Sequence, residues 1–166
     1  MSITISPADL PSLGAHQRDE AGRELQATLV ELIDLELAGK QFHWSVVGPH
    51  FRSLHLQLDE MVDSWRGLSD TVAERAVAIG YWPDGQARTV ADSSRALSSE
   101  RGPLEDHEVV RQLTRRLAET SERVRTRMDR VEDIDAASQD VLVEVLRGIE
   151  ESLWMMRAQL SDSERG

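Results

Sequence analysis

Four side chains with carboxylate or imidazole groups fall on one face of a single expected helix: His55, Asp59, Asp70 and Glu74. A helix turns about 100° per residue, so the members of each pair lie one turn apart and the two pairs share a face. The pairs are roughly 16 Å apart along the axis, too far for one metal ion to contact both. Imidazole and carboxylate suit Fe(II), Mn(II) or Zn(II) better than Cu(I), which prefers sulfur. The chain has no cysteine, so thiolate sites are excluded.

The two pairs are symmetric about the midpoint between positions 64 and 65. An identical helix placed antiparallel about a two-fold axis at that point would bring His55 opposite Glu74 of the second copy, and Asp59 opposite Asp70. One dimer would then hold two identical clusters, as an isologous contact requires.

The segment before this helix adds a fifth group. Gly48-Pro49-His50-Phe51 is a turn signal that ends the preceding helix near Val47. If the two helices fold back on each other about residue 49, His43 lies opposite His55. The predicted metal site takes three ligands from one chain and two from its neighbour: His43, His55 and Asp59, then Asp70 and Glu74.

A plainer alternative is that charged residues at helical spacing form a solvated face. A single pair of residues one turn apart favours that alternative. Five residues related by both the turn and the two-fold symmetry favour the metal site instead.

The composition limits the class of protein. The chain has 166 residues, enough for one domain with a good core. No apolar run approaches the ~20 residues needed to span a membrane. Residues 1–7 lack the basic and apolar regions of a signal peptide, and with no cysteine we expect a cytoplasmic protein. The net charge of −11, with Lys40 as the sole lysine, disfavours general attraction to DNA or membrane and favours cations, although an acidic surface also serves solubility alone.

Apolar residues follow the helical period in four long segments, so we expect an all-α, ferritin-like four-helix bundle. The first helix runs over about 19–47 and the second over about 51–79. A long crossover follows, with a short helix near 92–98. The third helix starts near Pro103 or Asp106, and the fourth runs to about 160 after a turn at 133–137, with Asp135 or Ser138 as its N-cap. We divide the chain into three parts: an arm (1–19), the bundle (20–160) and a short tail (161–166).

The spacing of the candidate ligands is similar to the signature of a known family. The spacing His-x11-His-x3-Asp-x10-Asp-x3-Glu, from His43 to Glu74, resembles the signature of the Dps family of bacterial mini-ferritins. The runs Lys40-Gln-Phe-His43-Trp44 and Asp70-Thr-Val-Ala-Glu74 belong to it, and Pro83-Asp84-Gly85 resembles actinobacterial members. The Glu-x-x-His motif of larger ferritins is absent from the chain.

The resemblance implies a function. It implies a hollow homo-oligomer of twelve subunits, built from two-fold dimers, that stores iron. It implies ferroxidase centres between subunits, which oxidise Fe(II) to Fe(III), with hydrogen peroxide as the favoured oxidant. It assigns His43, His55 and Asp59 to one subunit and Asp70 and Glu74 to the other. Zinc or manganese are other metals that such a site accommodates.

Two tryptophans accompany the predicted centre. The resemblance implies that Trp44, beside the ligand His43, lies close to the metal and intercepts radicals. Trp65 falls at the predicted two-fold axis. Both also suit a role as interface anchors, which tryptophan commonly serves, and for Trp65 we expect that role.

The start of the fourth helix carries three acidic residues. The segment from Asp135 to Asp140 resembles the acidic three-fold pore of the family, and Glu144 lies one turn further on. Three copies would concentrate cations, so these residues are candidates for an iron entry pore. The alternative is that Asp135 caps the helix and Asp140 interacts with its dipole.

Two competing functions remain to be weighed. A nucleoid-binding structural protein needs several cations in its tails, but residues 1–17 have no lysine or arginine, so we expect no DNA binding by the tails. The arginines of the third helix alternate with acids, which predicts a salt-bridged helix or a subunit interface. A metal-independent signalling bundle is the third hypothesis.

We interpret His16, His50 and His107 as ordinary surface or capping residues.

Overall fold

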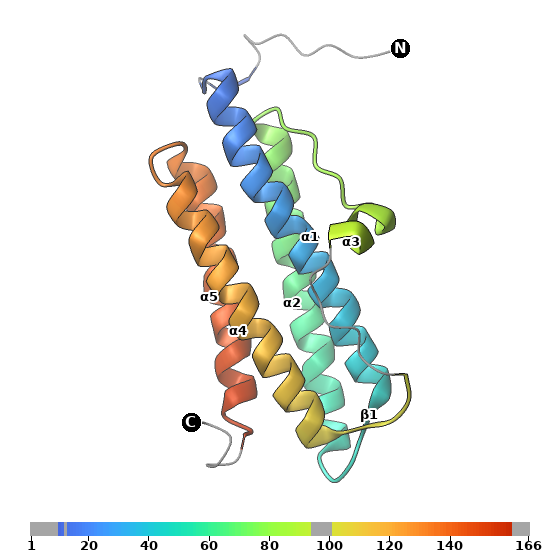
Figure 1. The fold of residues 1–166 in the computed structure, drawn as a ribbon. Helices are drawn as coiled ribbons and strands as arrows, with labels where there is room; N and C mark the ends of the chain where they lie inside the picture. Colours follow the sequence, from blue (N-terminus) through green and yellow to red (C-terminus); the bar gives the residue numbers. More distant parts are fainter. Residues whose placement is uncertain (1–9, 12, 94–100, 161–166) are drawn as a thin grey trace.

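The bundle consists of two helical hairpins. The computed structural model describes residues 10–11, 13–93 and 101–160. Helices α1 (Ala15–Ser45) and α2 (Phe51–Ala78) form one hairpin, and α4 (Asp106–Val131) and α5 (Ala136–Arg157) form the other. Figure 1 shows the two hairpins side by side, with the short helix α3 (Ala87–Ser93) outside the bundle on the crossover. The predicted ferritin-like bundle with a long crossover is confirmed.

The core lies between the four long helices. Their apolar stripes recur at helical spacing and meet inside the bundle, which is how an amphipathic helix buries its apolar face. The largest fully buried side chains come from every long helix: Trp65, Phe42, Leu25, Leu32, Leu54, Leu58, Ile79, Leu113, Leu117, Leu142, Ile149 and Met156. This packing fixes α1 against α2, the two helices that hold the predicted histidines.

Helix α1 begins at Ala15, so part of the predicted arm is helical. Gly14 is the N-cap, and its backbone N–H donates a hydrogen bond to Oε1 of Gln17 at 2.9 Å. Arg18 Nη1 donates to the carbonyl oxygen of Leu13 at 2.7 Å. These contacts satisfy polar groups at the helix start and extend the helix by a turn. Residues 1–9 of the predicted arm and the 161–166 tail lie outside the described residues.

The crossover differs from expectation in two details. Its helix is α3, at 87–93 rather than 92–98, and residues 94–98 lie outside the described part of the chain. Two short strands, β1 (Val46–Val47) and β2 (Leu104–Glu105), pair in parallel with Val46 opposite Leu104. The sequence showed no alternating pattern, because a two-residue strand is too short to produce one.

The α1–α2 turn is attached to the start of α4. Gly48 has φ 120°, a left-handed conformation that glycine adopts without strain, and a Cβ at this position would lie 2.8 Å from the carboxylate of Asp106. That carboxylate accepts a hydrogen bond from the backbone N–H of His50 at 2.8 Å. The hydrogen bond lowers the pKa of Asp106 and outweighs the opposing effect of desolvation. The carboxylate therefore holds the turn in place while ionised.

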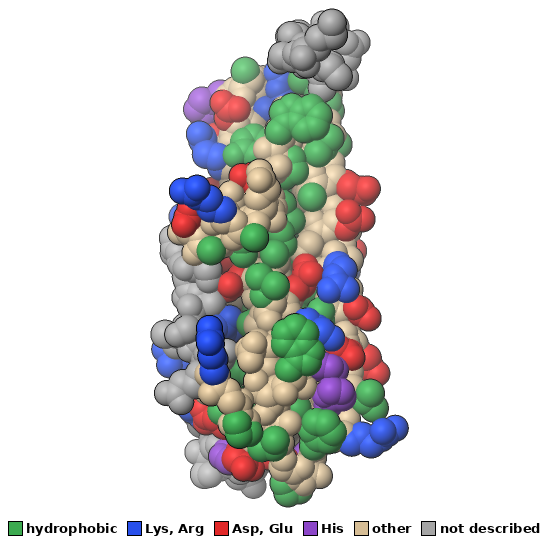
Figure 2. Space-filling model, turned by 90° about the vertical axis from the view of Figure 1, so that its right-hand side faces the viewer, with side chains coloured by type: hydrophobic (Ala, Val, Ile, Leu, Met, Phe, Trp, Pro, Cys, Tyr) green, Lys and Arg blue, Asp and Glu red, His purple; other side chains and the backbone are tan. Residues whose placement is uncertain are grey.

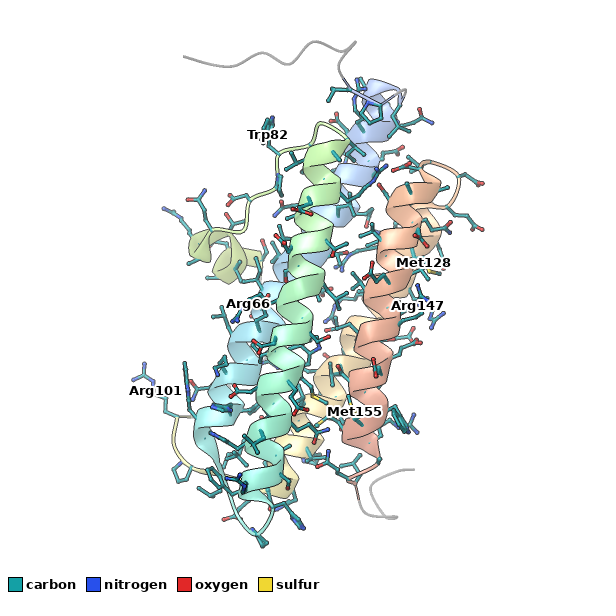
Figure 3. The ribbon with its side chains drawn as sticks, turned by 180° about the vertical axis from the view of Figure 1, so that it is seen from behind. Arg66, Trp82, Arg101, Met128, Arg147 and Met155 are labelled. Atoms are coloured by element: carbon teal, nitrogen blue, oxygen red, sulfur yellow. The ribbon has the colours of Figure 1, made fainter. Side chains whose placement is uncertain are left out.

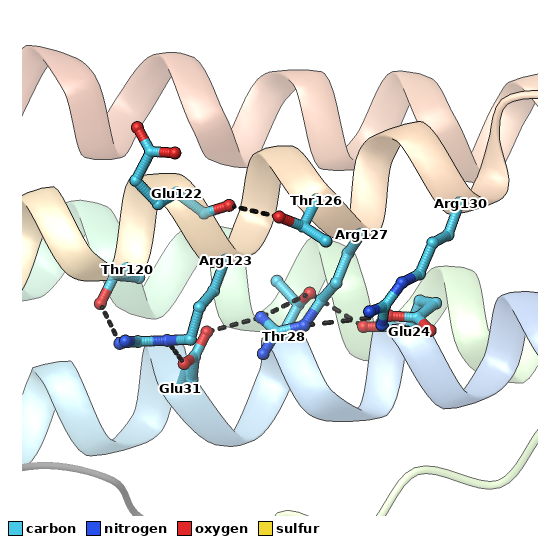
Figure 4. Close-up of polar contacts among 9 residues, drawn as sticks. All are labelled: Glu24, Thr28, Glu31, Thr120, Glu122, Arg123, Thr126, Arg127 and Arg130. Carbon is cyan, nitrogen blue, oxygen red and sulfur yellow. Dashed lines mark hydrogen bonds and ion pairs between the residues drawn. The ribbon is translucent and has the colours of Figure 1, made fainter.

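Ion pairs join α1 to α4, which confirms the salt-bridged helix predicted from the arginine pattern (Figure 4). Arg127 Nη1 lies 2.5 Å from Oε2 of Glu31, and Arg130 Nη1 lies 3.3 Å from Oε1 of Glu24. Arg123 also binds Glu31. The remaining arginines of α4 pair with acids as well: Arg111 with Glu108, Arg115 with Glu119, Arg116 with Asp34, and Arg125 with Glu150.

Candidate metal centre

The two histidines of the predicted site stack on each other across the α1–α2 hairpin. Their ring centroids are 3.6 Å apart, and the ring planes are inclined by 20°. His43 is buried with 8% of its surface exposed, and His55 is half-buried. Helical periodicity and the turn at residue 49 thus place these residues together, as predicted.

Reciprocal hydrogen bonds orient the two rings. Nδ1 of His43 lies 2.8 Å from the carbonyl oxygen of His55, and Nδ1 of His55 lies 2.9 Å from the carbonyl oxygen of His43. A carbonyl oxygen only accepts, so both Nδ1 atoms carry the proton. Each Nε2 then keeps its lone pair. Histidines that bind metals commonly donate their other ring N–H to a backbone carbonyl in this way.

Asp59 provides the negative charge beside the histidines. Its Oδ1 lies 3.3 Å from Nδ1 of His43 and 2.5 Å from Nζ of Lys40. The Lys40 hydrogen bond lowers the pKa of Asp59 below its ordinary value, against a weaker opposing effect of desolvation. The carboxylate is therefore ionised at neutral pH, and the Lys40 ammonium would compete with a metal cation for it.

Lys40 was not predicted as a site residue. Its position in the sequence could have indicated its role, because it lies three residues before His43 and therefore on the same face of α1. Its ammonium is also 6.0 Å from the ring centroid of Trp44.

A glycine lets the two helices approach closely one turn from the histidines. A Cβ on Gly39 would lie 2.6 Å from Cγ2 of Val62 and 2.9 Å from Cζ3 of Trp65. Non-bonded carbon atoms pack best at about 3.5–4.0 Å, so any larger residue would push α1 away from α2.

The other two predicted ligands lie further along α2. Asp70 and Glu74 are exposed, and about three helical turns separate Asp70 from Asp59. Asp70 lines a groove beside α2 whose other walls include Leu29 of α1 and Pro83 of the crossover. Within one chain these two acids do not join the histidine cluster, as the spacing predicted. That a second copy brings them there stays a prediction.

A different group places three ligand atoms within 4.8 Å of one another: Glu105, Asp106 and His107. It is the only such group in the described part of one chain. Asp106 already accepts hydrogen bonds from the backbone N–H groups of His50 and His107. The group also surrounds the N-terminus of α4, where the helix dipole disfavours a cation. We therefore assign it a structural role.

Trp65 corrects a prediction. It is fully buried in its own subunit, and its Nε1–H donates to Oγ of Ser152 at 3.1 Å. A tryptophan in the core of one chain is not an interface anchor. Trp44, in contrast, is 70% exposed. Figure 2 shows histidines beside a basic side chain and large apolar side chains on one face of the molecule.

The three candidate pore residues separate into two kinds. Asp135 is the N-cap of α5, because its carboxylate accepts from the backbone N–H of Ser138 at 3.1 Å and pairs with Arg75 Nη2 at 2.5 Å. Desolvation raises the pKa of Asp135, but hydrogen bonds from Ser138 and Arg75 outweigh it and lower the pKa overall. The capping alternative is thus confirmed for Asp135. Asp140 and Glu144 are exposed and stay candidates.

His16 and His50 have partners outside the site. His16 Nδ1 lies 3.0 Å from Oε2 of Glu20. His50 is more than a surface residue, because its Nδ1 lies 3.1 Å from Oδ2 of Asp106.

In the described segments, none of the helices has the length and apolarity that crossing a membrane requires.

Comparison with known proteins supports one family. The model of the ferritin-like domain family matches residues 23–166. A protein from Deinococcus radiodurans named DNA protection during starvation protein 2 is 34% identical over 154 residues, which cover 93% of this chain and 64% of that protein, so the chain spans less than two thirds of it. The DNA protection during starvation protein from Mycolicibacterium smegmatis is 31% identical, and the match covers 93% of this chain and 84% of that protein.

Solved structures agree with the sequence comparison. A tetragonal form of Dps from Mycobacterium smegmatis has a TM-score of 0.88 at 29% identity and covers 98% of this chain and 95% of its own. DpsA14 from Streptomyces coelicolor has a TM-score of 0.88 at 29% identity, with coverages of 93% and 92%. The bundle, the long crossover and the family match together show that this chain belongs to the Dps family of ferritin-like proteins.

Proposed function

We propose that the protein oxidises Fe(II) at sites shared between two subunits and stores the ferric product. The observation that carries this proposal is the stacked pair of His43 and His55, with both Nδ1 atoms held by carbonyl oxygens and both Nε2 atoms left for a metal. The family is associated with iron storage, and iron here is the substrate.

The second copy completes the site. Its Asp70 and Glu74 would add two carboxylates opposite His55 and Asp59, giving two imidazoles and three carboxylates for each centre. Carboxylate ligands stabilise Fe(III) over Fe(II), which favours oxidation. Fe(II) must first displace the ammonium of Lys40 from Asp59.

The proposed oxidant is hydrogen peroxide. Two Fe(II) ions each lose one electron, the O–O bond of one peroxide breaks, and two protons complete the formation of two water molecules. Because both electrons arrive from one centre, no free hydroxyl radical forms. The ferric product then hydrolyses and deposits as mineral inside a hollow dodecamer, and Asp140 and Glu144 are the proposed entry route for Fe(II).

The test is anaerobic oxidation of Fe(II) on addition of hydrogen peroxide, followed optically. The native protein is expected to consume about one peroxide per two irons. His43→Ala and Asp70→Ala are each expected to behave like buffer while they remain folded by circular dichroism. If the native protein also behaves like buffer, or if both variants keep the native stoichiometry, the proposal fails.

DNA protection is the second candidate, because the relatives carry that name. All seven arginines between positions 111 and 130 pair with carboxylates, which leaves them poorly placed to bind phosphate. A gel shift at low salt, with and without Mg²⁺, distinguishes the two candidates. We expect no shift without Mg²⁺, and a shift without it would favour direct DNA binding.

A further inference from the structure

Two oppositely charged residues occupy the part of α2 between the two ligand pairs. Asp63 lies one turn after Asp59, and Arg66 lies one turn before Asp70, so both fall on the ligand face of the helix. Asp63 and Arg66 are 76% and 61% exposed at their side chains. Between His55 and Arg75 the sequence holds five carboxylates and no other lysine or arginine than Arg66.

The structure holds Arg66 in a defined place. Its Nη1 lies 3.2 Å from Oδ1 of Asp63, and its Nε lies 3.4 Å from Oε2 of Glu36 on α1. Glu36 has only 13% of its side chain exposed, and it accepts a hydrogen bond from Oγ of Ser69 at 2.7 Å. Figure 3 shows Arg66 on the same side of the α1–α2 pair as α3. The guanidinium is thus anchored at the surface of the helix.

A groove runs along this face. It is lined by Asp63, Arg66, Gly67 and Asp70 of α2, and by Pro83 and Gly85 of the crossover. A Cβ on Gly67 would meet no atom within 4 Å. The surface of α2 beside the charged pair is therefore open at Gly67.

The symmetry that relates the ligands also relates these two charges. Asp63 and Arg66 lie equally far from the midpoint of positions 64 and 65, as His55 and Glu74 do. We propose that Asp63 and Arg66 of one copy form ion pairs with Arg66 and Asp63 of a second copy, and that these reciprocal pairs set the antiparallel register of the contact. The inference rests on the proposed function, because it assumes that the two copies meet through the same α2–α2 contact that brings Asp70 and Glu74 to the metal site.

Charge complementarity is the physical reason to expect the α2 helix of a second copy on this face. Two α2 helices that each carry five carboxylates on or near one face repel each other when they approach. Arg66 is the one basic side chain that offsets this repulsion at the axis. An antiparallel helix in this register brings each Arg66 to an Asp63, whereas a parallel helix in register brings like charges together, and like-charge contacts oppose the wrong arrangement.

Charge reversal tests the proposal. Asp63→Arg alone, or Arg66→Asp alone, places four like charges at the axis, so each variant is expected to form the two-fold dimer at least tenfold more weakly than the native protein. The two variants mixed together place opposite charges at both contacts. We therefore expect co-expressed, differently tagged chains to form almost only mixed dimers, measured by native mass spectrometry.

The mixing experiment distinguishes an ion pair between two chains from the Asp63–Arg66 ion pair within one helix. In the mixture, neither chain regains its own Asp63–Arg66 pair, so a purely intrahelical role predicts no rescue. A matched control reverses the exposed pair of α4, with Arg115→Glu in one chain and Glu119→Arg in the other. These control chains are expected to mix at random.

The outcomes for the two proposals are distinct, because assembly is read without iron. Random mixing of the Asp63 and Arg66 variants, or native dimers from either variant alone, would overturn the inference even if the native protein consumes peroxide. Preferred mixed dimers in a protein that oxidises no iron would uphold the inference and refute the proposed function.

Discussion

The close crossing of α1 and α2 at Gly39 makes a prediction that joins packing to the metal site. In Gly39→Ala the new Cβ would lie 2.6 Å from Val62 Cγ2 and 2.9 Å from Trp65 Cζ3. Relief of these contacts requires a separation of about 1 Å, because carbon atoms pack best at about 3.5–4.0 Å.

Two opposing terms set the change in stability. Overpacking a core costs about 1–3 kcal/mol. Alanine in place of a helix-interior glycine contributes about 1 kcal/mol in favour of the helix. We therefore expect the free energy of unfolding of Gly39→Ala to fall by about 0–2 kcal/mol, where an exposed helical glycine would gain stability instead.

The same displacement reaches the histidines. The reciprocal hydrogen bonds of 2.8 and 2.9 Å between His43 and His55 span α1 and α2. A shift of about 1 Å takes them beyond hydrogen-bonding distance, so each ring loses the contact that fixes its tautomer. Binding of Co(II), measured by calorimetry without oxygen, is expected to weaken.

The assay is urea unfolding at fixed protein concentration, because assembly shifts apparent stability. Val62→Ala supplies the control, since it removes one of the two clashing groups and should cost less stability in the Gly39→Ala background than in the native one. If Gly39→Ala is about 1 kcal/mol more stable than the native protein and binds Co(II) equally well, the reasoning is refuted.

Three further predictions concern single side chains. Lys40→Met removes the ammonium that competes for Asp59, so Co(II) should bind about two- to fivefold more tightly near pH 7, and unchanged calorimetry would contradict this. Asp135→Ala removes a helix cap and an ion pair, so urea unfolding at neutral pH should show a loss of at least about 1 kcal/mol. Because the folded-state pKa of Asp135 is lowered, that loss should be full above its ordinary pKa and vanish as pH falls through the lowered value. Trp65→Ala should cost about 3–5 kcal/mol, whereas Trp82→Ala, at an exposed position, should cost almost nothing by the same assay.

The helices and the histidine pair were predictable, because both follow from helical periodicity and one turn. The prediction for Trp65 was wrong, because it used the position of the residue along the helix axis and not its direction around the helix. A helix turns about 100° per residue, so Trp65 points away from the ligand face and into the core, while Asp63 and Arg66 lie on that face near the axis.

Features that depend on tertiary contacts were missed. The pairing of Val46 with Leu104 joins two segments far apart in sequence and too short to show a strand pattern. The extra turn of α1 depends on Gly14 and Gln17, which carry no strong helix signal. Lys40 was visible as the sole lysine, but its contact with Asp59 became evident only when α1 and α2 were placed together.

The central claim is that each metal site is shared between two chains, and subunit mixing tests it most directly. His43→Ala and Asp70→Ala chains, each inactive alone, would be co-expressed and purified through two different tags. In a mixed dimer one site carries both defects and the other carries neither. Random mixing within dodecamers should therefore restore Fe(II) oxidation by peroxide at about a quarter of all sites, and isolated mixed dimers should show it at about half of theirs. Mixed assemblies that form but stay inactive would contradict a site shared between two chains.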